Sequence, residues 1–396
     1  MAHHAVFIQN QAEARRCLQA IGASSDGIEY MIPKAVFRCI KIKNLDSRAA
    51  NLLKQEMLAK GGEAAVNRNA ALGTGHSDVL LMGTLKHYRY LIEKLKLQPF
   101  GLRQVAAEIE SILAALEQKD TAMELANGKN LAIGQRTLIM GILNVTPDSF
   151  SDGGRYFDPD RAVQHALDMK RDGADIIDLG GASSRPDARI AGAAEELARV
   201  LPVIKRLVRE DIIISVDTFR AEVAQQVLEQ GAHLINDIGG LQMDPALNEV
   251  LAKWQAPVIL MHNRLQINRG EPYKDLIADI TDELISSIDT AVQAGLDPEK
   301  IIIDPGICFG KTPAENRLII KHLSAFKSLG KPLLLGTSRK SFIGHTLDLE
   351  VNERLEGSLA TVAMGIMNGA DIIRVHDVKA SKRVALMTDA VRQENG

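Results

Sequence analysis

Between residues 138 and 377, short apolar segments alternate with segments whose apolar residues recur every three or four positions. The first pattern is typical of buried strands and the second of amphipathic helices. It predicts strands at Leu138–Asn144, Ile176–Leu179, Ile212–Asp217, Leu234–Asn236, Val258–Met261, Ile301–Ile303, Leu333–Leu335 and Ile372–Val375. It predicts helices at Pro159–Asp172, Ala194–Glu210, Ala221–Glu229, Asp244–Lys253, Asp275–Ala294, Ala314–Ser328 and Asn352–Asn368, with a last helix after Val378.

Eight strand–helix repeats in this length match a (β/α)8 TIM barrel, an α/β fold with one parallel sheet. The rival is a doubly wound open sheet, which usually has fewer strands and a glycine-rich first turn. That turn is missing after the first predicted strand. The pattern therefore favours the barrel.

The region before the barrel has a different rhythm and predicts a small α/β domain. Its predicted strands are Val36–Ile42 and Asp78–Met82, its helices Ser47–Ala59, Leu85–Leu95 and Leu102–Leu116, with a loop at Asn67–His76. The short polar segment Gly128–Gln135 marks the boundary. We therefore expect domains at residues 1–128 and 129–396, with the second able to fold alone.

Charge and cysteine content indicate which partners and which cellular compartment to expect. The formal net charge is −3, and no basic cluster typical of nucleic-acid binding is evident. The three cysteines lie far apart without metal-ligand spacing, which favours a reducing compartment. We expect no signal peptide and no membrane span, because no basic start followed by a long apolar run is present. A cytoplasmic protein is the expectation.

Polar residues follow seven of the eight predicted strands, where barrel active sites are built. Each could simply cap the next helix, but their common position indicates a site. They are Asn144, Asp217, Asn236 with Asp237, His262 after Met261, Asp304, Ser338-Arg339-Lys340, and Arg374 to Asp377.

Two kinds of chemistry are combined in this set. Carboxylates, an amide and a lysine suit the donor and acceptor edge of a flat heterocycle, and those residues are Asp217, Asn236, Asp304 and Lys340. Arginine, histidine and amide groups suit phosphate oxygens, and those are Asn144, Arg185, Arg374 and His376. The Asn144 carbonyl could also be a ligand of Mg²⁺.

Five segments resemble the signatures of dihydropteroate synthases, and the match covers residues 136–396. They are Met-Gly-Ile-Leu-Asn-Val-Thr-Pro-Asp-Ser-Phe-Ser-Asp-Gly-Gly (140–154), Gly-Gly-Ala-Ser-Ser-Arg-Pro (180–186), Asp-Pro-Gly-Ile-Cys-Phe-Gly-Lys-Thr (304–312), Gly-Thr-Ser-Arg-Lys-Ser-Phe-Ile-Gly (336–344), and Gly-Ser-Leu-Ala (357–360) with Arg-Val-His-Asp (374–377). That family joins 4-aminobenzoate to a dihydropterin methyl diphosphate and releases pyrophosphate. The resemblance implies the same reaction in folate biosynthesis here.

The resemblance also implies a role for each matching residue. The pterin would be held by Asp217, Asn236, Asp304 and Lys340, with Met261, Phe309 and Gly336 lining its slot. The diphosphate would meet Asn144, Arg374 and His376, with Mg²⁺ at Asn144. Ser338 would receive the aminobenzoate, and Ser184 and Arg185 would lie in a loop that closes over the substrates. A homodimer is expected by resemblance alone.

The chain departs from the family pattern in its loops. Ala182 stands where a glutamate is usual, Asp187 and Cys308 replace glycines, and Phe219-Arg220 replace small or lysine residues. After His262 the chain reads Asn-Arg where a glutamine and a glycine are common, so His262 could orient its neighbours or only pack. These changes concern aminobenzoate binding and loop closure more than the pterin residues.

Three functions stay open on the sequence. A folate-dependent corrinoid methyltransferase shares the barrel and the pterin residues, but it needs neither the 336–344 nor the 374–377 motif. A non-catalytic or altered-substrate pterin-binding homologue is the other alternative. The N-terminal domain carries no assignable motif, and assembly or regulation is favoured over a second activity.

Overall fold

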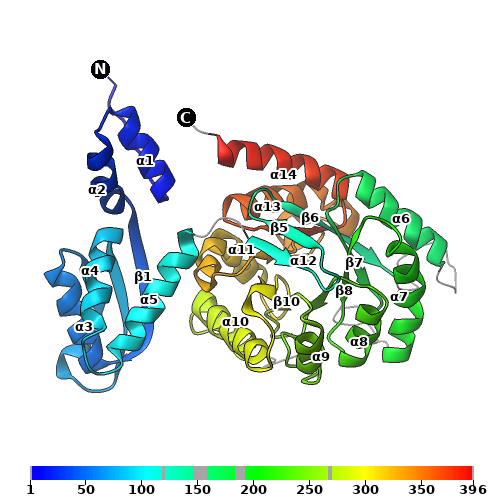
Figure 1. Cartoon of the computed structure of the whole chain (residues 1–396), viewed down its shortest axis with the longest axis horizontal. Coiled ribbons are helices and arrows are strands. Elements are labelled where there is room, and N and C mark those ends of the chain that lie inside the picture. Colours follow the sequence, from blue (N-terminus) through cyan, green and yellow to red (C-terminus); the bar gives the residue numbers. More distant parts are fainter. Residues whose placement is uncertain (1, 118–120, 146–157, 183–191, 266–269, 395–396) are drawn as a thin grey trace. The chain divides into compact units, whose positions relative to one another are not determined.

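The structure is a computed structural model that describes residues 2–117, 121–145, 158–182, 192–265 and 270–394. The chain divides into two compact units, Met1–Gln118 and Lys119–Gly396 (Figure 1). The division therefore falls earlier in the chain than the polar segment suggested. The reason is that residues 121–133 form a β-hairpin whose apolar side chains belong to the core of the second unit.

The first unit is an α/β domain around an antiparallel sheet in the order β1-β3-β2. Its strands are β1 (Phe37–Asp46), β2 (Glu63–Val66) and β3 (His76–Thr84). Its helices are α1 (Gln11–Ala20), α2 (Ser25–Ala35), α3 (Ser47–Ala59), α4 (Leu85–Leu95) and α5 (Leu102–Glu117). The sequence did not predict α1, α2 or β2, and a 3-10 turn (Arg68–Leu72) lies in the predicted loop.

The described residues of the second unit contain an eight-stranded parallel sheet in the order β11-β10-β9-β8-β7-β6-β13-β12. The strands are β6 (Leu138–Asn144), β7 (Ile176–Gly180), β8 (Ile213–Asp217), β9 (Leu234–Asp237), β10 (Val258–Met261), β11 (Ile301–Asp304), β12 (Leu334–Leu335) and β13 (Ile372–Val375). Its two end strands meet through a bridge between Ile303 and Leu333. The sheet is thus a nearly closed barrel, and the predicted fold class is confirmed.

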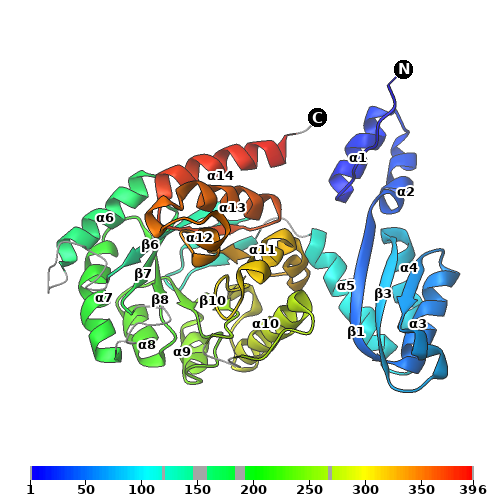
Figure 2. The same cartoon turned by 180° about the vertical axis from the view of Figure 1, so that it is seen from behind.

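Helices surround this barrel (Figures 1 and 2). They are α6 (Pro159–Arg171), α7 (Ala193–Leu207), α8 (Ala221–Glu229), α9 (Leu247–Trp254), α10 (Leu276–Gln293), α11 (Pro313–Lys321), α12 (Ser341–Leu347), α13 (Leu355–Met367) and α14 (Val378–Gln393). The prediction missed α12 and merged α11 with the 3-10 segment Leu323–Leu329. Local caps fix several starts, as where Thr312 and Glu315 form a capping box at α11.

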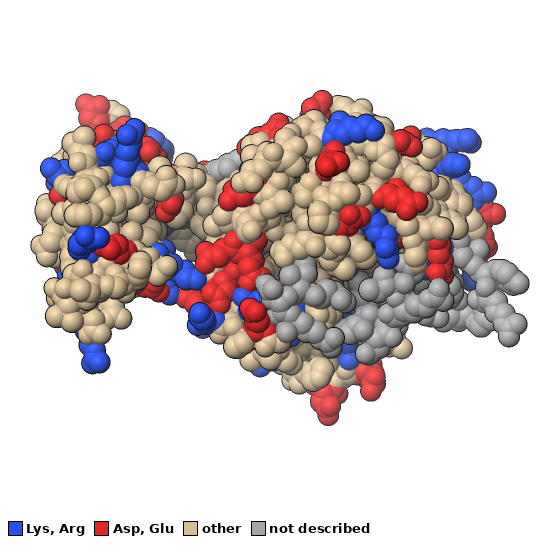
Figure 3. Space-filling view, turned by 90° about the horizontal axis from the view of Figure 1, so that it is seen from below, with Lys and Arg blue, Asp and Glu red and all other residues tan. Residues whose placement is uncertain are grey.

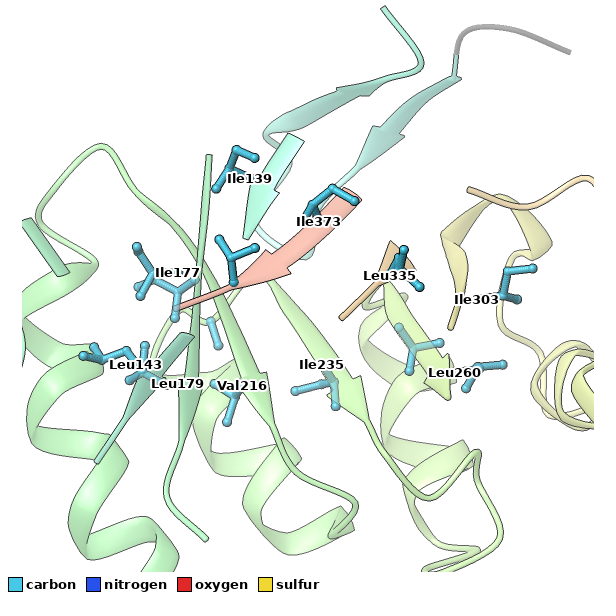
Figure 4. Close-up of a cluster of buried hydrophobic side chains, with 14 of the residues drawn as sticks. Ile139, Leu143, Ile177, Leu179, Val216, Ile235, Leu260, Ile303, Leu335 and Ile373 are labelled. Carbon is cyan, nitrogen blue, oxygen red and sulfur yellow. The ribbon is translucent and has the colours of Figure 1, made fainter. Parts of the chain in front are cut away.

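The outward faces of the strands pack against the helices (Figure 4). Ile139, Ile177, Val216, Leu260 and Ile373 point this way, and each is at most 1% exposed. The branched and bulky side chains fill the layer between sheet and helices. This layer explains why alternate strand positions are apolar along their whole length.

The inward faces form a second apolar layer at the amino-terminal end of the barrel. Leu138, Ile176, Leu234, Ile302 and Ile372 gather there with residues of the hairpin β4 (Thr121–Glu124) and β5 (Asn130–Ile133). The hairpin contributes Met123, Leu125, Leu131 and Ile133, all at most 4% exposed. The hairpin therefore closes this end of the barrel and leaves the other end for polar groups.

Candidate active site

Strand periodicity brings the polar residues inside the barrel. Side chains two positions apart on a strand point the same way, so Asn236 shares the inward face with Leu234, and Asp304 shares it with Ile302. Arg374 follows Ile372 in the same manner. A polar layer thus lies directly above the apolar layer, at the carboxyl-terminal ends of the strands, where barrel enzymes bind substrates.

Four residues on adjacent strands form one row of this layer. Asn144 pairs in register with Gly180, Gly180 with Asp217, and Asp217 with Asn236. A Cβ at Gly180 would lie 3.2 Å from Asn144 Oδ1, so glycine lets the exposed Asn144 side chain sit over this strand. The same Cβ would lie 4.0 Å from Asp217 Cβ.

Arg374 joins three of the strands through an ion-pair network. Its Nε donates to Asp178 Oδ2 at 2.7 Å, and its NH2 group donates to Asp217 Oδ2 at 2.8 Å. Asn236 Nδ2 donates to the same Asp178 oxygen at 3.0 Å. Arg374 therefore contacts the residues assigned to the pterin, although the sequence placed it in the phosphate set.

Sequence analysis missed Asp178, which lies at the centre of this network. It is 0% exposed, and its Oδ1 has no hydrogen-bond partner among the described residues. One signal was present, because a carboxylate stood between isoleucine and leucine in a predicted buried strand. Such a group is almost always paired or functional.

The network contains two carboxylates and only one guanidinium, and this imbalance affects the pKa of Asp217. Burial raises the pKa of Asp217 to about 7, with Asp178 acting the same way and Arg374 opposing both. The folded protein therefore holds a proton that the unfolded chain has released above about pH 4. The contribution of Asp217 to the free energy of unfolding must then fall as pH rises toward 7.

We expect the Asp217→Asn variant to lose part of this pH dependence. The slope attributable to Asp217 is at most about 1.4 kcal/mol per pH unit between pH 4 and 7. Melting temperatures measured at several pH values should therefore rise in the variant relative to the wild type as the pH increases from 4 to 7. Asp172→Asn, which changes an exposed carboxylate, is the control and should keep the wild-type slope. Equal slopes for Asp217→Asn and the wild type would contradict the assignment.

A second group of predicted residues lies on the neighbouring strands. Met261 pairs in register with Asp304, and both side chains face inward at 4% and 6% exposure. Lys340 Nζ donates to the Ile307 carbonyl at 2.6 Å and lies 5.0 Å from the centre of the Phe309 ring. Burial raises the pKa of Asp304 and lowers that of Lys340, while the charge of each opposes the shift of the other.

The loop after β12 is tied to the loop after β13. His376 N–H donates to Ser338 Oγ at 3.2 Å, and His376 Nδ1 lies 3.0 Å from the same oxygen. Arg339 makes a double ion pair with Asp377, at 2.9 and 2.6 Å. Two of the predicted site residues, Ser338 and His376, are thus brought together. Gly336 lies beside Arg374, whose Cβ would be 3.6 Å from a Cβ added there.

Some of the residues predicted from the sequence are not found in the polar layer. Ser184 and Arg185 lie outside the described residues, as do the loop positions 146–154. Asp237 points away from the barrel interior and accepts hydrogen bonds from the amides of Gly239 and Leu241. Asp237 therefore shapes the loop after β9 and caps no helix, since α9 begins at Leu247.

Asn144 would need help to hold a metal ion. Among the residues that the structure describes, no three His, Cys, Asp or Glu side chains gather as metal ligands. Mg²⁺ commonly binds through one or two protein oxygens together with water and substrate phosphates. The exposed Asn144 amide beside Gly180 fits an ion that arrives with a diphosphate, but not an ion held by protein alone.

On the described part of the face in Figure 3, Lys and Arg side chains are interspersed with Asp and Glu and form no continuous basic stripe. Within the described helices, none is long and apolar enough to cross a membrane.

The barrel is thus closed at one end by the hairpin and carries an acceptor-rich and cationic layer at the other, where barrel enzymes build their active sites. The sequence matches the family model of pterin binding enzymes over residues 140–376. The chain belongs to this family of pterin binding enzymes.

Known relatives agree with this assignment. The dihydropteroate synthase of Bacillus subtilis is 50% identical over 267 residues, which are 67% of this chain and 92% of the relative. The Clostridium difficile dihydropteroate synthase, whose structure was determined in the presence of pteroic acid, is 49% identical in sequence, with a TM-score of 0.64. The match covers 66% of this chain and 99% of that one. The Xanthomonas albilineans enzyme with 4-aminobenzoic acid is 38% identical with a TM-score of 0.66, covering 70% of this chain and 100% of its own.

A further relative extends across both units. A probable bifunctional folylpolyglutamate synthase/dihydropteroate synthase of Halobacterium salinarum is 39% identical over 383 residues. The match spans 96% of this chain but 46% of the relative. The N-terminal unit is therefore shared with a longer protein, whereas the Bacillus match has the length of the barrel.

Proposed function

We propose that the chain is a transferase that joins 4-aminobenzoate to 6-hydroxymethyl-7,8-dihydropterin diphosphate, giving 7,8-dihydropteroate and pyrophosphate. The observation that carries this proposal is the polar layer of Asp178, Asp217, Asn236, Asp304 and Arg374 inside the barrel. Its carboxylates and amide match the amino and ring N–H groups of a pterin. Half of the residues aligned with the Bacillus enzyme are also identical.

In this proposal one group of residues binds the pterin ring and a second group stabilises the diphosphate as it leaves. Asp217, Asn236 and Asp304 would fix the pterin so that its methylene carbon faces the amine. Arg374 and His376 would meet the departing diphosphate, whose charge grows as the C–O bond breaks. An aromatic amine attacks without prior deprotonation, so positioning and electrostatics carry the reaction.

Lys340, Met261, Phe309 and Gly336 would complete the pterin slot, and Ser338 would lie near the aminobenzoate with Ser184 and Arg185. Mg²⁺ bound to the diphosphate would contact Asn144 and supply further charge stabilisation.

The direct test supplies both substrates and measures pyrophosphate and pteroate. The transferase forms both products in equal amounts. Tight pterin binding without pyrophosphate release would favour a non-catalytic homologue, and methyl transfer from a methylated folate to a corrinoid would favour the methyltransferase. Neither outcome is compatible with the proposed reaction.

Asp217→Ala should weaken binding of the pterin alone. Removing the carboxylate leaves ring donors without an acceptor in a buried layer, at a cost of about 1–3 kcal/mol, or roughly 5- to 150-fold in affinity. Calorimetry with the pterin should show this loss, while Asp172→Ala should bind as the wild type does. Unchanged affinity in Asp217→Ala would remove Asp217 from the pterin site.

A cytoplasmic homodimer completes the proposal. Neighbouring helices α13 and α14 expose Met364, Met367, Leu386, Met387 and Val391, each at least half exposed. Exposed apolar side chains on adjacent helices favour a subunit interface. The free cysteines fit a reducing compartment.

A further inference from the structure

Lys311 is a partly buried lysine that the proposed reaction does not use, and burial lowers the pKa of its side chain to about 7. Its Nζ lies 2.8 Å from His262 Nδ1, and it donates to the carbonyls of Gly306 at 2.8 Å and Phe309 at 3.1 Å. The His262 carbonyl oxygen, 3.4 Å from Nζ, is a fourth and longer contact. The side chain therefore ties the loop after β11 to the residue that follows β10.

These two loops pack closely at two further points. A Cβ at Gly306 would lie 1.9 Å from the His262 carbonyl oxygen, and one at Gly310 would lie 2.6 Å from the Arg264 carbonyl carbon. Both glycines also have positive φ angles, of 69° and 72°. No other residue type fits these contacts without a shift of backbone, so the close approach of the two loops depends on glycine at both positions.

The loop that Lys311 holds carries much of the proposed pterin slot. It begins at Asp304, whose Oδ1 accepts from the Gly306 amide at 2.7 Å. It continues through Ile307, whose carbonyl accepts from Lys340, and Phe309, whose ring faces Lys340. A small displacement of this loop would therefore move both the carboxylate and the lysine that meet the pterin.

We propose that Lys311 is a positioning residue for pterin binding, acting through the β11–α11 loop and His262 without touching the substrate. This inference rests on the proposed function, since it assigns a role within the same site. It also accounts for His262, whose ring lies between Lys311 Nζ and a carboxylate oxygen of Glu283.

The surroundings of His262 keep this link in one arrangement. Because Nδ1 accepts from Lys311, the ring proton of neutral His262 resides on Nε2, which lies 3.0 Å from Glu283 Oε2. Burial lowers the pKa of His262 to about 4, so the ring is neutral near pH 7. Arg264 Nε donates to the other oxygen of Glu283 at 2.9 Å and thereby holds that carboxylate in place.

The test compares Lys311→Met with Lys300→Met in the full chain. Lys300 is a second lysine of this unit whose Nζ contacts a carbonyl, that of Glu124 at 2.6 Å, but it is buried and lies at the closed end of the barrel. Both variants should melt at lower temperature than the wild type. Lys311→Met should raise the Kd for the pterin alone about 10- to 100-fold, because the loop loses its anchor. Lys300→Met should leave that Kd within about twofold.

A second pair protects the test against a Lys311 variant that fails to fold. Gln at position 262 can accept from Lys311 and donate to Glu283, whereas Leu can do neither. His262→Gln should keep the pterin Kd within about threefold, and His262→Leu should raise it at least about tenfold. An unchanged Kd in folded Lys311→Met or in His262→Leu, or an equal rise in Lys300→Met, overturns the proposal.

The same samples separate this inference from the proposed function. Wild-type turnover with both substrates tests the reaction, and pterin binding across the variants tests the positioning role. A wild type that binds pterin but releases no pyrophosphate defeats the reaction alone. Full turnover in the wild type with no loss of pterin affinity in Lys311→Met defeats the inference alone.

Discussion

Arg374→Ala is expected to lower kcat by roughly 10²–10³, the scale of losing one preorganised donor to a developing negative charge. It should also weaken binding of the pterin alone, because Arg374 holds Asp178 and Asp217 by bonds of 2.7 and 2.8 Å. Removing the cation leaves Asp178 and Asp217 without their counter-charge, at a cost of about 3–5 kcal/mol in stability. Steady-state kinetics, pterin calorimetry and thermal melting measure the three effects.

A double variant separates the electrostatic cost from the chemical one. Arg374→Met with Asp178→Asn removes one charge of each sign and should recover much of the stability lost by Arg374→Met alone. Turnover should stay low, because the donor to the leaving group is still missing. Wild-type pterin affinity in Arg374→Ala would show that the residue acts only on the diphosphate, and this outcome would contradict the role of the network.

Truncation should have an equally large effect that depends on where the chain begins. A protein of residues 119–396 retains the whole hairpin and should fold and form pteroate, as barrel-length relatives suggest. A protein of residues 129–396 loses β4, including Met123 and Leu125, which are 1% and 2% exposed. Losing each such side chain costs about 2–5 kcal/mol, against a typical stability of 5–15 kcal/mol. We expect this shorter protein to be largely unfolded or insoluble.

Expression level, circular dichroism and pteroate formation distinguish the two truncations. The substitution Leu125→Ala in the full chain is the milder control and should lower the melting temperature without abolishing activity. A fully active protein of residues 129–396 would show that β5 alone closes the barrel. An inactive protein of residues 119–396 would show that the N-terminal unit supports the active site.

The barrel could be predicted from sequence because its signals are local and repeated. Each strand, such as Val258–Met261, is a short apolar run between helices of clear periodicity. The residues at the strand ends could also be predicted, since topology alone brings Asp217, Asn236 and Asp304 to one end. The hairpin also carried a signal, which the placement of the domain boundary overlooked. Met123, Leu125, Leu131 and Ile133 occupy alternate positions on either side of a turn that contains Asn127-Gly128, a pattern typical of a β-hairpin.

The hydrogen bonds and ion pairs among the site residues, in contrast, leave no local signal in the sequence. Nothing local to Arg374 indicates that it pairs with Asp178, which lies 196 positions away in the sequence. Lys311 reads as an ordinary lysine of a glycine-rich loop until His262 is seen beside it. Such pairs depend on which strands become neighbours and on the inward or outward direction of each side chain. For the same reason Asp237 was grouped with inward residues, although strand alternation turns it outward.

The seam of the barrel has a thermodynamic consequence. Strands β11 and β12 meet through the bridge from Ile303 to Leu333, and β12 is two residues long. Local opening is easiest where the ladder is sparse. A pterin bound to both Asp304, at the end of β11, and Lys340, in the loop after β12, would connect the two strands across this seam. Part of its binding free energy would then raise the free energy needed to separate β11 from β12. Pterin binding and closure of the barrel would therefore be thermodynamically linked.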